Sequence, residues 1–174
     1  MERKLLLLGI LRNQEMYGYQ LNEYIDNSLA ACVDLKRPTA YYLLNKMEAD
    51  GWVVYQEDQD GKRPTRRIYS ITSQGEAAYQ RLLRENLRTY AGVNFDDDIG
   101  LAFLDTLDGE EALALLQLRR EGIVEKMTQI KDIPIHPGSY QWMIEHQARH
   151  LENELAWVDT VIEKITNSEV KEKK

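Results

Sequence analysis

The sequence predicts a mainly α-helical fold with one small β-hairpin, on the basis of three observations. Up to Gly51, three short stretches carry apolar residues at helical spacing. From Trp52 to Ile71 the apolar period changes to 2, in two runs rich in β-branched and aromatic residues. After residue 95 the helical period returns in long segments joined by a His-Pro-Gly turn. We therefore expect a winged helix-turn-helix domain, with the hairpin as the wing, followed by antiparallel C-terminal helices.

The third N-terminal helix, residues 36–51, is the most informative. Pro38 suits the first turn of a helix, and Gly51 suits the residue just past its end. One face is an apolar stripe, made of Ala40, Leu43, Leu44 and Met47. The opposite face carries no acidic residue and begins beside Lys36 and Arg37. A short helix with an apolar back and a neutral-to-basic front fits insertion into a DNA major groove.

Two shorter helices are expected before it. Residues 3–12 are apolar nearly all round, which predicts cover from their own domain and from a second subunit, with Leu5 and Leu8 as the subunit contacts. A polar break at 13–16 follows. The second helix opens at Tyr17, and its inner stripe is Leu21, Tyr24, Ile25 and Leu29.

The hairpin loop is basic. Its Asp-Gly turn lies within residues 58–65, between strands expected at 52–57 and 66–71. From Gly61 to Arg67 there is no acidic residue and there are four basic ones: Lys62, Arg63, Arg66 and Arg67. Such a tip can lie against the phosphate backbone or reach into the minor groove. The alternative is a solvated turn kept soluble by its charges.

The C-terminal half begins after a boundary at 91–95. A helix with capping-box spacing starts at Ser73 and is expected to run to about Tyr90. We predict a DNA-binding domain at 1–90, a helical dimerisation domain at 96–166 and a disordered charged tail at 167–174. Three aspartates at 96–98 favour the start of a short helix, and a longer helix follows Asp108.

The last helix, from Ser139 to about Thr166, has the clearest period in the chain. Its apolar residues alternate at spacings of 4 and 3, as in a coiled coil: Ile144, Ala148, Leu151, Leu155, Val158, Ile162 and Ile165. We expect part of this seam to pack on a second copy of the chain. The alternative is a helical hairpin formed entirely within one chain.

Charge separates the two halves. The formal net charge is −7, but residues 1–90 carry 13 Lys+Arg against 12 Asp+Glu, and residues 91–174 carry 9 against 17. The acidic half would repel phosphates, which leaves the first half as the DNA side. The apolar run at residues 5–10 is too short to span a bilayer, and no cleavable leader precedes it, so we expect a soluble cytoplasmic protein. The single cysteine excludes an intramolecular disulfide framework.

Other chemistry is weakly indicated. The sequence has no Gly-rich phosphate loop, nucleophile elbow or Cys/His cluster, so we expect neither an enzyme nor a cofactor. His146 and His150 are four residues apart, but Gln147 stands where a zinc protease needs glutamate, which favours solvated surface histidines. Trp142 and Trp157 are candidates to bind a flat aromatic ligand, and the alternative is that they are core residues.

Three motifs in order resemble the PadR-like family of bacterial transcriptional regulators. Residues 17–21, Tyr-Gly-Tyr-Gln-Leu, resemble the family's His-Gly-Tyr-Glu-Leu element. Residues 39–48 resemble its Thr-Leu-Tyr-Pro-x-Leu-x-x-Leu-Glu recognition helix. Gly61-Lys62-Arg63-Pro64 and the Tyr-Ser-Ile-Thr-Ser-Gln-Gly at 69–75 resemble its wing signature. The resemblance covers residues 1 to about 85.

The resemblance implies a homodimeric repressor that is released from its operator by a small ligand or stress signal. Tyr41 matches the family's recognition-helix tyrosine, and Lys62 and Arg63 match its basic wing. Two positions depart from the pattern. Tyr42 replaces the usual proline, which makes the reading surface bulkier, and Tyr17 replaces a histidine whose role does not transfer.

These observations lead to an assignment of contacts. We expect Thr39, Tyr42 and Asn45 to reach base edges or thymine methyl groups, and Lys36, Arg37, Lys46 and the Tyr41 hydroxyl to hold phosphates. Tyr41 also lies at the edge of the buried stripe, so packing is its alternative role. A two-fold dimer expects a pseudo-palindromic operator with half-sites about 34 Å apart and a salt slope of about −7. The competing class is a winged helix that binds a protein partner rather than DNA.

Overall fold

The computed structural model describes residues 1–26, 35–59, 65–90, 92 and 95–172, with side chains through residue 167. Leu29, Cys32, Lys62 and Arg63 lie outside the described residues. The chain divides into two compact units, Met1–Gly92 and Val93–Lys174. Each is described by itself.

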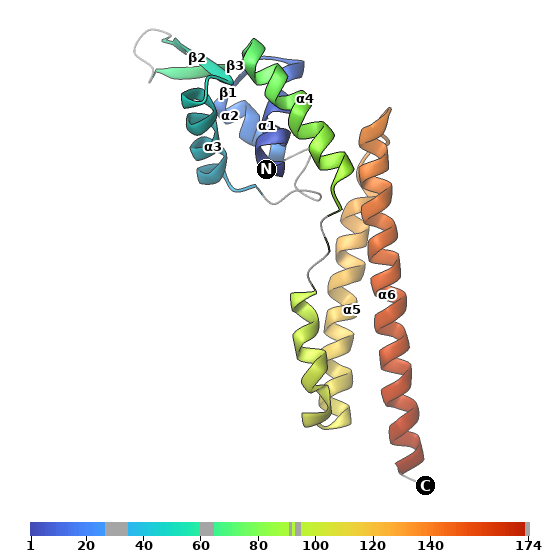
Figure 1. Ribbon diagram of the computed structural model, residues 1–174. Helices are drawn as coiled ribbons and strands as arrows, with labels where there is room; N and C mark the ends of the chain where they lie inside the picture. The colour runs from blue at the N-terminus through green and yellow to red at the C-terminus, as the bar shows by residue number, and fades with distance from the viewer. Residues whose placement is uncertain (27–34, 60–64, 91, 93–94, 173–174) are drawn as a thin grey trace. The chain divides into compact units, whose positions relative to one another are not determined.

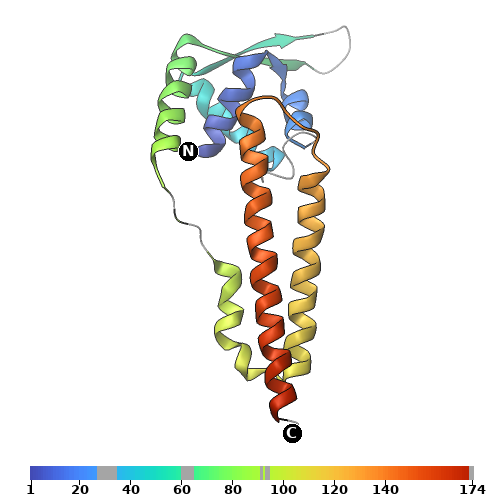
Figure 2. The same cartoon turned by 90° about the vertical axis from the view of Figure 1, so that its right-hand side faces the viewer.

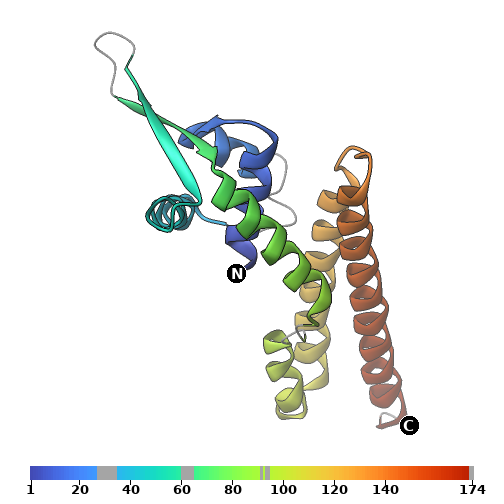
Figure 3. The same ribbon diagram turned by 45° about the horizontal axis from the view of Figure 1, so that its top comes forward.

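The first unit is a small helical domain with a three-stranded sheet (Figure 1). Its elements in order are α1 (Glu2–Asn13), β1 (Met16–Tyr17), α2 (Gly18–Tyr24), α3 (Arg37–Ala49), β2 (Val53–Asp58), β3 (Arg66–Ile71) and α4 (Ser73–Arg88). The strand order is β1-β3-β2, and both pairings are antiparallel. The β2–β3 hairpin projects beyond the helices, as Figure 3 shows. The winged helix-turn-helix prediction is confirmed.

The predicted apolar stripe of α3 forms much of the core. Ala40, Leu44 and Met47 are completely buried, and Leu43 is half-buried. They pack in a core that includes Leu7, Leu8, Leu21, Ile25 and Val53. The end of α3 also follows the prediction, because Gly51 has a φ of 72°, which an L side chain rarely adopts. The core therefore holds α3 by its back and leaves its front exposed.

Three local predictions for this unit need correction. Met16 and Tyr17, expected in a polar break and at a helix start, form the short strand β1 against β3. Tyr24 is exposed rather than buried, because α2 ends there and Leu21 and Ile25 supply its core contacts. The cap of α4 is Thr72, whose hydroxyl oxygen accepts from the Gly75 amide at 2.9 Å, so the helix is capped one residue before Ser73.

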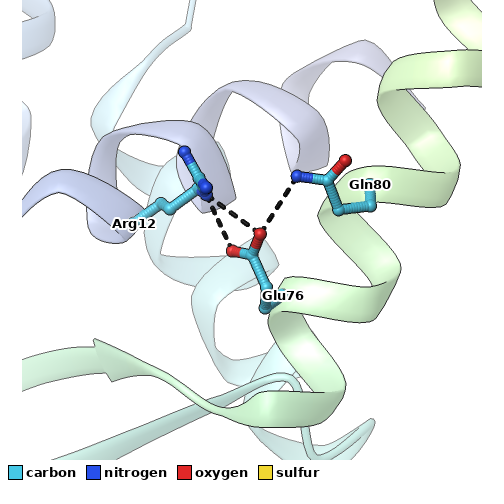
Figure 4. Close-up of polar contacts among 3 residues, drawn as sticks. All are labelled: Arg12, Glu76 and Gln80. Atoms are coloured by element: carbon cyan, nitrogen blue, oxygen red, sulfur yellow. Dashed lines mark hydrogen bonds and ion pairs between the residues drawn. The ribbon is translucent and has the colours of Figure 1, made fainter.

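A polar cluster joins α1 to α4 (Figure 4). The Arg12 guanidinium Nε donates to both carboxylate oxygens of Glu76, at 2.9 and 3.0 Å. The Gln80 side-chain amide donates to the same carboxylate at 3.0 Å. These hydrogen bonds, that of Gln80 first, lower the pKa of Glu76 from its usual value of 4.5. The cluster fixes the two helices that lie furthest apart in the sequence of this unit.

The second unit is a helical hairpin with a shorter helix beside it (Figures 1 and 2). A 3-10 helix, η2 (Asp96–Thr106), precedes the long helices α5 (Gly109–Lys131) and α6 (Ser139–Glu172). Arg119 of α5 donates to Asp98 of η2 at 2.8 Å, and Arg120 donates to Asp159 of α6 at 2.7 Å. The expected antiparallel helices are confirmed, although the first helix is 3-10 rather than α.

Helix α6 is longer than expected. It continues to Glu172, beyond the predicted end near Thr166, so the segment expected to be a disordered tail is helical as far as that residue. Across the described residues, none of the helices combines the length and apolar character needed to cross a bilayer.

Candidate nucleic-acid interface

The front of α3 presents the residues that periodicity assigned to it. Tyr42 is 63% exposed, Asn45 and Lys46 are exposed, and Thr39 is half-buried. No acidic side chain stands in the first turn of the helix, and Lys46 lies in its last turn. Positive or neutral groups therefore occupy the whole of this face, as a surface that approaches phosphates requires.

An open cleft of about 340 Å³ lies where α3 meets the wing. It is lined by residues of α3, of the β1–α2 junction and of β3: Tyr17, Gly18, Tyr19, Tyr41, Asn45, Thr65, Arg66, Arg67 and Tyr69. None of these nine is acidic. Tyrosine hydroxyls, one amide and two guanidinium groups are the donors that hold nucleic-acid phosphates.

Tyr41 is placed in the cleft by a glycine. A Cβ atom added to Gly18 would lie 2.7 Å from Tyr41 Cε1 and 3.0 Å from its hydroxyl. The tyrosine ring therefore covers the start of α2 while staying part-exposed. Both roles proposed for Tyr41 hold at once, since one face packs on Gly18 and the hydroxyl stays in the cleft.

The basic residues differ in what they contact. Arg37 pairs with Asp26 at 2.9 Å, so the expected phosphate contact competes with an ion pair at the end of α2. Arg67 lies 4.0 Å from Glu57 and stacks over the Tyr55 ring at 4.1 Å. Arg66 lies over the Tyr19 ring at 5.6 Å and has no ion-pair partner among the described residues. Lys36 is exposed.

Tyr19 is a cleft residue that the sequence did not single out. It stacks on Tyr17, with ring centroids 5.5 Å apart, and carries Arg66 on its other contact. The signal was present in the Tyr-Gly-Tyr motif, but the helical stripe used to read α2 treats Tyr19 only as an outer residue. Tyr17 donates its hydroxyl to Asp58 Oδ2 at 2.6 Å, and this hydrogen bond raises the pKa of the tyrosine.

The expected dimer contacts divide into two groups. Leu8, Ile144 and Val158 are already buried within the single chain, which leaves them no surface to offer a second copy. The others are partly exposed: Leu5, Ala148, Leu151, Leu155, Ile162 and Ile165. The seam is thus used, at least in part, to pack α6 within its own unit, which is the intramolecular alternative.

The two tryptophans of the second unit are not core residues. Trp142 is 71% exposed and Trp157 is 41% exposed, with the Arg119 guanidinium 5.6 Å from the Trp157 ring centroid. His146 and His150 are both exposed on α6. Within the described part of the chain, no three His, Cys, Asp or Glu side chains come together as a metal site.

Comparisons with known proteins agree with this arrangement. Residues 7–81 match the model of the transcriptional regulator PadR-like family. The negative transcriptional regulator PadR of Bacillus subtilis is 22% identical over 138 residues, which are 79% of this chain and 72% of that protein. Its crystal structure in complex with operator DNA has a TM-score of 0.78 at 19% identity, covering 93% of this chain and 98% of that one.

Two further solved structures are similar over nearly the whole chain. Bacillus subtilis PadR in complex with p-coumaric acid gives a TM-score of 0.75 at 18% identity, with 94% of each chain covered. The Vibrio cholerae virulence activator AphA gives 0.74 at 16% identity, with 95% of this chain and 99% of that one covered. At these identities the likeness establishes the fold of both units.

Proposed function

Because the chain belongs to the PadR-like family of transcriptional regulators, we propose that it represses transcription as a homodimer that binds a pseudo-palindromic operator. Family membership points to a regulator rather than an enzyme. The proposed site of action is the bacterial cytoplasm, where the chromosome lies. One relative is described as a negative regulator and another as an activator, so the direction of control is part of the proposal.

The observation that carries the proposal is the cleft between α3 and the wing. It brings Tyr41 and Asn45 beside Arg66 without any acidic lining residue. Asn45 can read adenine in the major groove through two hydrogen bonds, and the exposed ring of Tyr42 can contact thymine methyl groups. The basic wing residues, including Lys62 and Arg63 from the sequence, would add backbone or minor-groove contacts.

Dimerisation through the second unit is supported by its exposed apolar side chains. Phe103 is 65% exposed and Leu118 is 63% exposed, and the half-exposed seam residues of α6 add to the apolar surface. Large exposed apolar side chains gathered in one unit indicate a protein interface. A dimer would place two copies of α3 about 34 Å apart, in successive major grooves.

A small aromatic molecule is the proposed inducer, because the Bacillus subtilis relative is solved with p-coumaric acid. Trp142 and Trp157 are the proposed binding residues, since both rings are exposed. Titration with aromatic acids, followed by tryptophan fluorescence, tests this. Quenching that is lost in Trp157→Phe supports the assignment, and unchanged fluorescence across a broad panel of acids would contradict it.

The alternative function is a protein-interaction module without DNA contact. A module of that kind has no need to keep acidic residues out of the cleft. Binding to a labelled duplex selected from a random pool separates the two functions. A duplex bound at 100 mM salt supports the regulator, and failure to recover any bound duplex from the pool supports the module.

The first prediction concerns Arg66. Arg66→Gln removes one cation per subunit from the cleft, so DNA affinity should fall and the log–log salt slope of the dimer should become shallower by about 2. Fluorescence anisotropy at several salt concentrations measures both quantities. Lys131→Gln, at the end of α5, is the matched control and should change neither. An unchanged slope in Arg66→Gln would remove the wing from the interface.

A further inference from the structure

The wing contains two opposite-charge pairs on adjacent rungs. In the register of β2 and β3, Glu57 faces Arg67 and Asp58 faces Arg66. Directly opposed residues on antiparallel strands have Cβ atoms about 4.5–5.5 Å apart, which is close enough for an acid and an arginine to pair. Successive residues point to opposite faces of a strand. One pair therefore lies on the cleft side of the hairpin, and the other lies on its far side.

The two rungs behave differently. On the first, the Glu57 carboxylate lies 4.0 Å from Arg67 Nε, and the ion pair is formed. On the second, Asp58 and Arg66 make no ion pair, although both belong to the described residues. The register alone does not explain this difference, because both rungs offer the same geometry to the same charges.

Tyr17 explains the second rung. Its hydroxyl donates to Asp58 Oδ2 at 2.6 Å, so the carboxylate is directed toward the β1–α2 junction instead of across the hairpin. The Arg66 guanidinium lies over the Tyr19 ring at 5.6 Å, inside the cleft that also holds Tyr41. The stack of Tyr17 on Tyr19, at 5.5 Å, keeps these two arrangements in step.

We propose that Tyr17 is a positioning residue for DNA binding: by donating to Asp58 it withholds that carboxylate from Arg66 and leaves the guanidinium for a DNA phosphate. The inference rests on the proposed function, because it assigns a role within the same DNA-binding cleft. An arginine neutralised by a neighbouring carboxylate would release fewer counterions on binding, so the hydrogen bond sets how much of the charge of the wing is available to DNA.

The test removes one oxygen atom. Tyr17→Phe keeps the ring stack and loses the donor, so Asp58 should turn to its cross-strand partner Arg66. Affinity for a duplex selected by the wild-type protein should fall about tenfold, as expected for one charge-assisted contact per subunit. The salt slope should become shallower by about 2 for the dimer, matching Arg66→Gln. Tyr90→Phe, outside the cleft, is the control for the substitution and should change neither quantity.

The double variant Tyr17→Phe/Asp58→Asn separates positioning from simple structural support. Removing the carboxylate frees Arg66 again, so affinity and salt slope should return to near the wild-type values. If the hydrogen bond only held the fold together, the double variant would bind as weakly as Tyr17→Phe, or more weakly, and the proposal would be overturned.

The remaining outcomes are also decisive. Should Tyr17→Phe fail to fold, as judged by circular dichroism, Asp58→Asn alone carries the test, because it must retain the full salt slope. A loss of slope in that variant overturns the proposal. A wild-type protein that binds but is unaffected by Tyr17→Phe overturns only the role of Tyr17. A wild-type protein that binds no duplex overturns the proposed function as well.

Discussion

Gly18 shows how one missing side chain places a functional one. Its backbone does not need the left-handed conformation, since the described glycines with positive φ are Gly51 and Gly138. What the position needs is space, because a Cβ atom would lie within 2.7 Å of the Tyr41 ring. The glycine of the Tyr-Gly-Tyr motif is thus explained by a residue of the recognition helix, more than twenty positions away in the sequence.

Gly18→Ala should therefore weaken DNA binding more than it weakens folding. The new methyl group would push the Tyr41 ring out of its place in the cleft, and affinity for the operator should fall roughly tenfold, on the scale of one lost hydrogen bond to a charged group in each subunit. Thermal unfolding and DNA titration of the same sample measure the two effects. Gly122→Ala is the control, because no atom lies within 4 Å of a Cβ there. Equal affinity in Gly18→Ala and wild type would exclude Tyr41 from the interface.

Periodicity predicted the candidate site only where helical register decides exposure. Asn45 and Tyr42 follow from the apolar stripe of α3, and both are exposed. Register could not show that Arg37 pairs with Asp26 at 2.9 Å, because the geometry of the intervening turn sets that distance. Tyr19 was missed for a similar reason. Its role arises from Arg66, which the hairpin brings back to the start of α2.

At the scale of elements, the α1–α4 cluster gives a pH-dependent contribution to stability. The pKa of Glu76 is lowered in the folded state, so the unfolded chain binds a proton more readily than the folded one. The stabilisation is therefore present above the ordinary pKa of 4.5 and is lost as the pH falls through the lowered value.

Glu76→Gln should lower the melting temperature at pH 7 by a few degrees, since the ion pair with Arg12 at 2.9 Å is lost. The difference from wild type should shrink as the pH falls below 4.5, where the wild-type carboxyl also becomes protonated. Differential scanning calorimetry between pH 3 and pH 7 follows this change. Glu85→Gln on the same helix is the control. A difference that stays constant down to pH 3 would show that the charge of Glu76 does not stabilise the fold.

Elements were predicted where they are long enough to show a period. The three N-terminal helices, both hairpin strands and both long C-terminal helices follow from the sequence. The strand β1 did not, because two residues cannot display a period of 2, and it is defined only by pairing with β3. The cap of α4 was displaced by one residue for a tertiary reason. Thr72 also donates to the Gly51 carbonyl at 2.7 Å, and this contact decides where the helix begins.

At the scale of the whole molecule, charge and structure divide the chain at nearly the same place. The first unit ends at Gly92, close to the point where the balance changes from nearly neutral to acidic. The acidic residues of the second unit are suited to a surface that stays away from phosphates. Its exposed apolar residues are suited to self-association. The sequence predicted this division, but it could not predict which apolar residues α5 and α6 cover within the chain.

The dimer prediction follows from that last distinction. Phe103 and Leu118 are more than 60% exposed in the single chain, whereas Val158 is completely buried. Phe103→Ser/Leu118→Ser should therefore weaken the dimer at least tenfold while leaving the melting temperature of the monomer nearly unchanged, because these side chains contribute apolar area mainly to the interface. Val158→Ser should instead destabilise the unit itself. Sedimentation equilibrium separates the two cases, and DNA affinity should fall with dimer affinity, since one subunit reaches only one half-site. A double variant that dimerises like the wild type would place the interface on the half-exposed α6 seam instead.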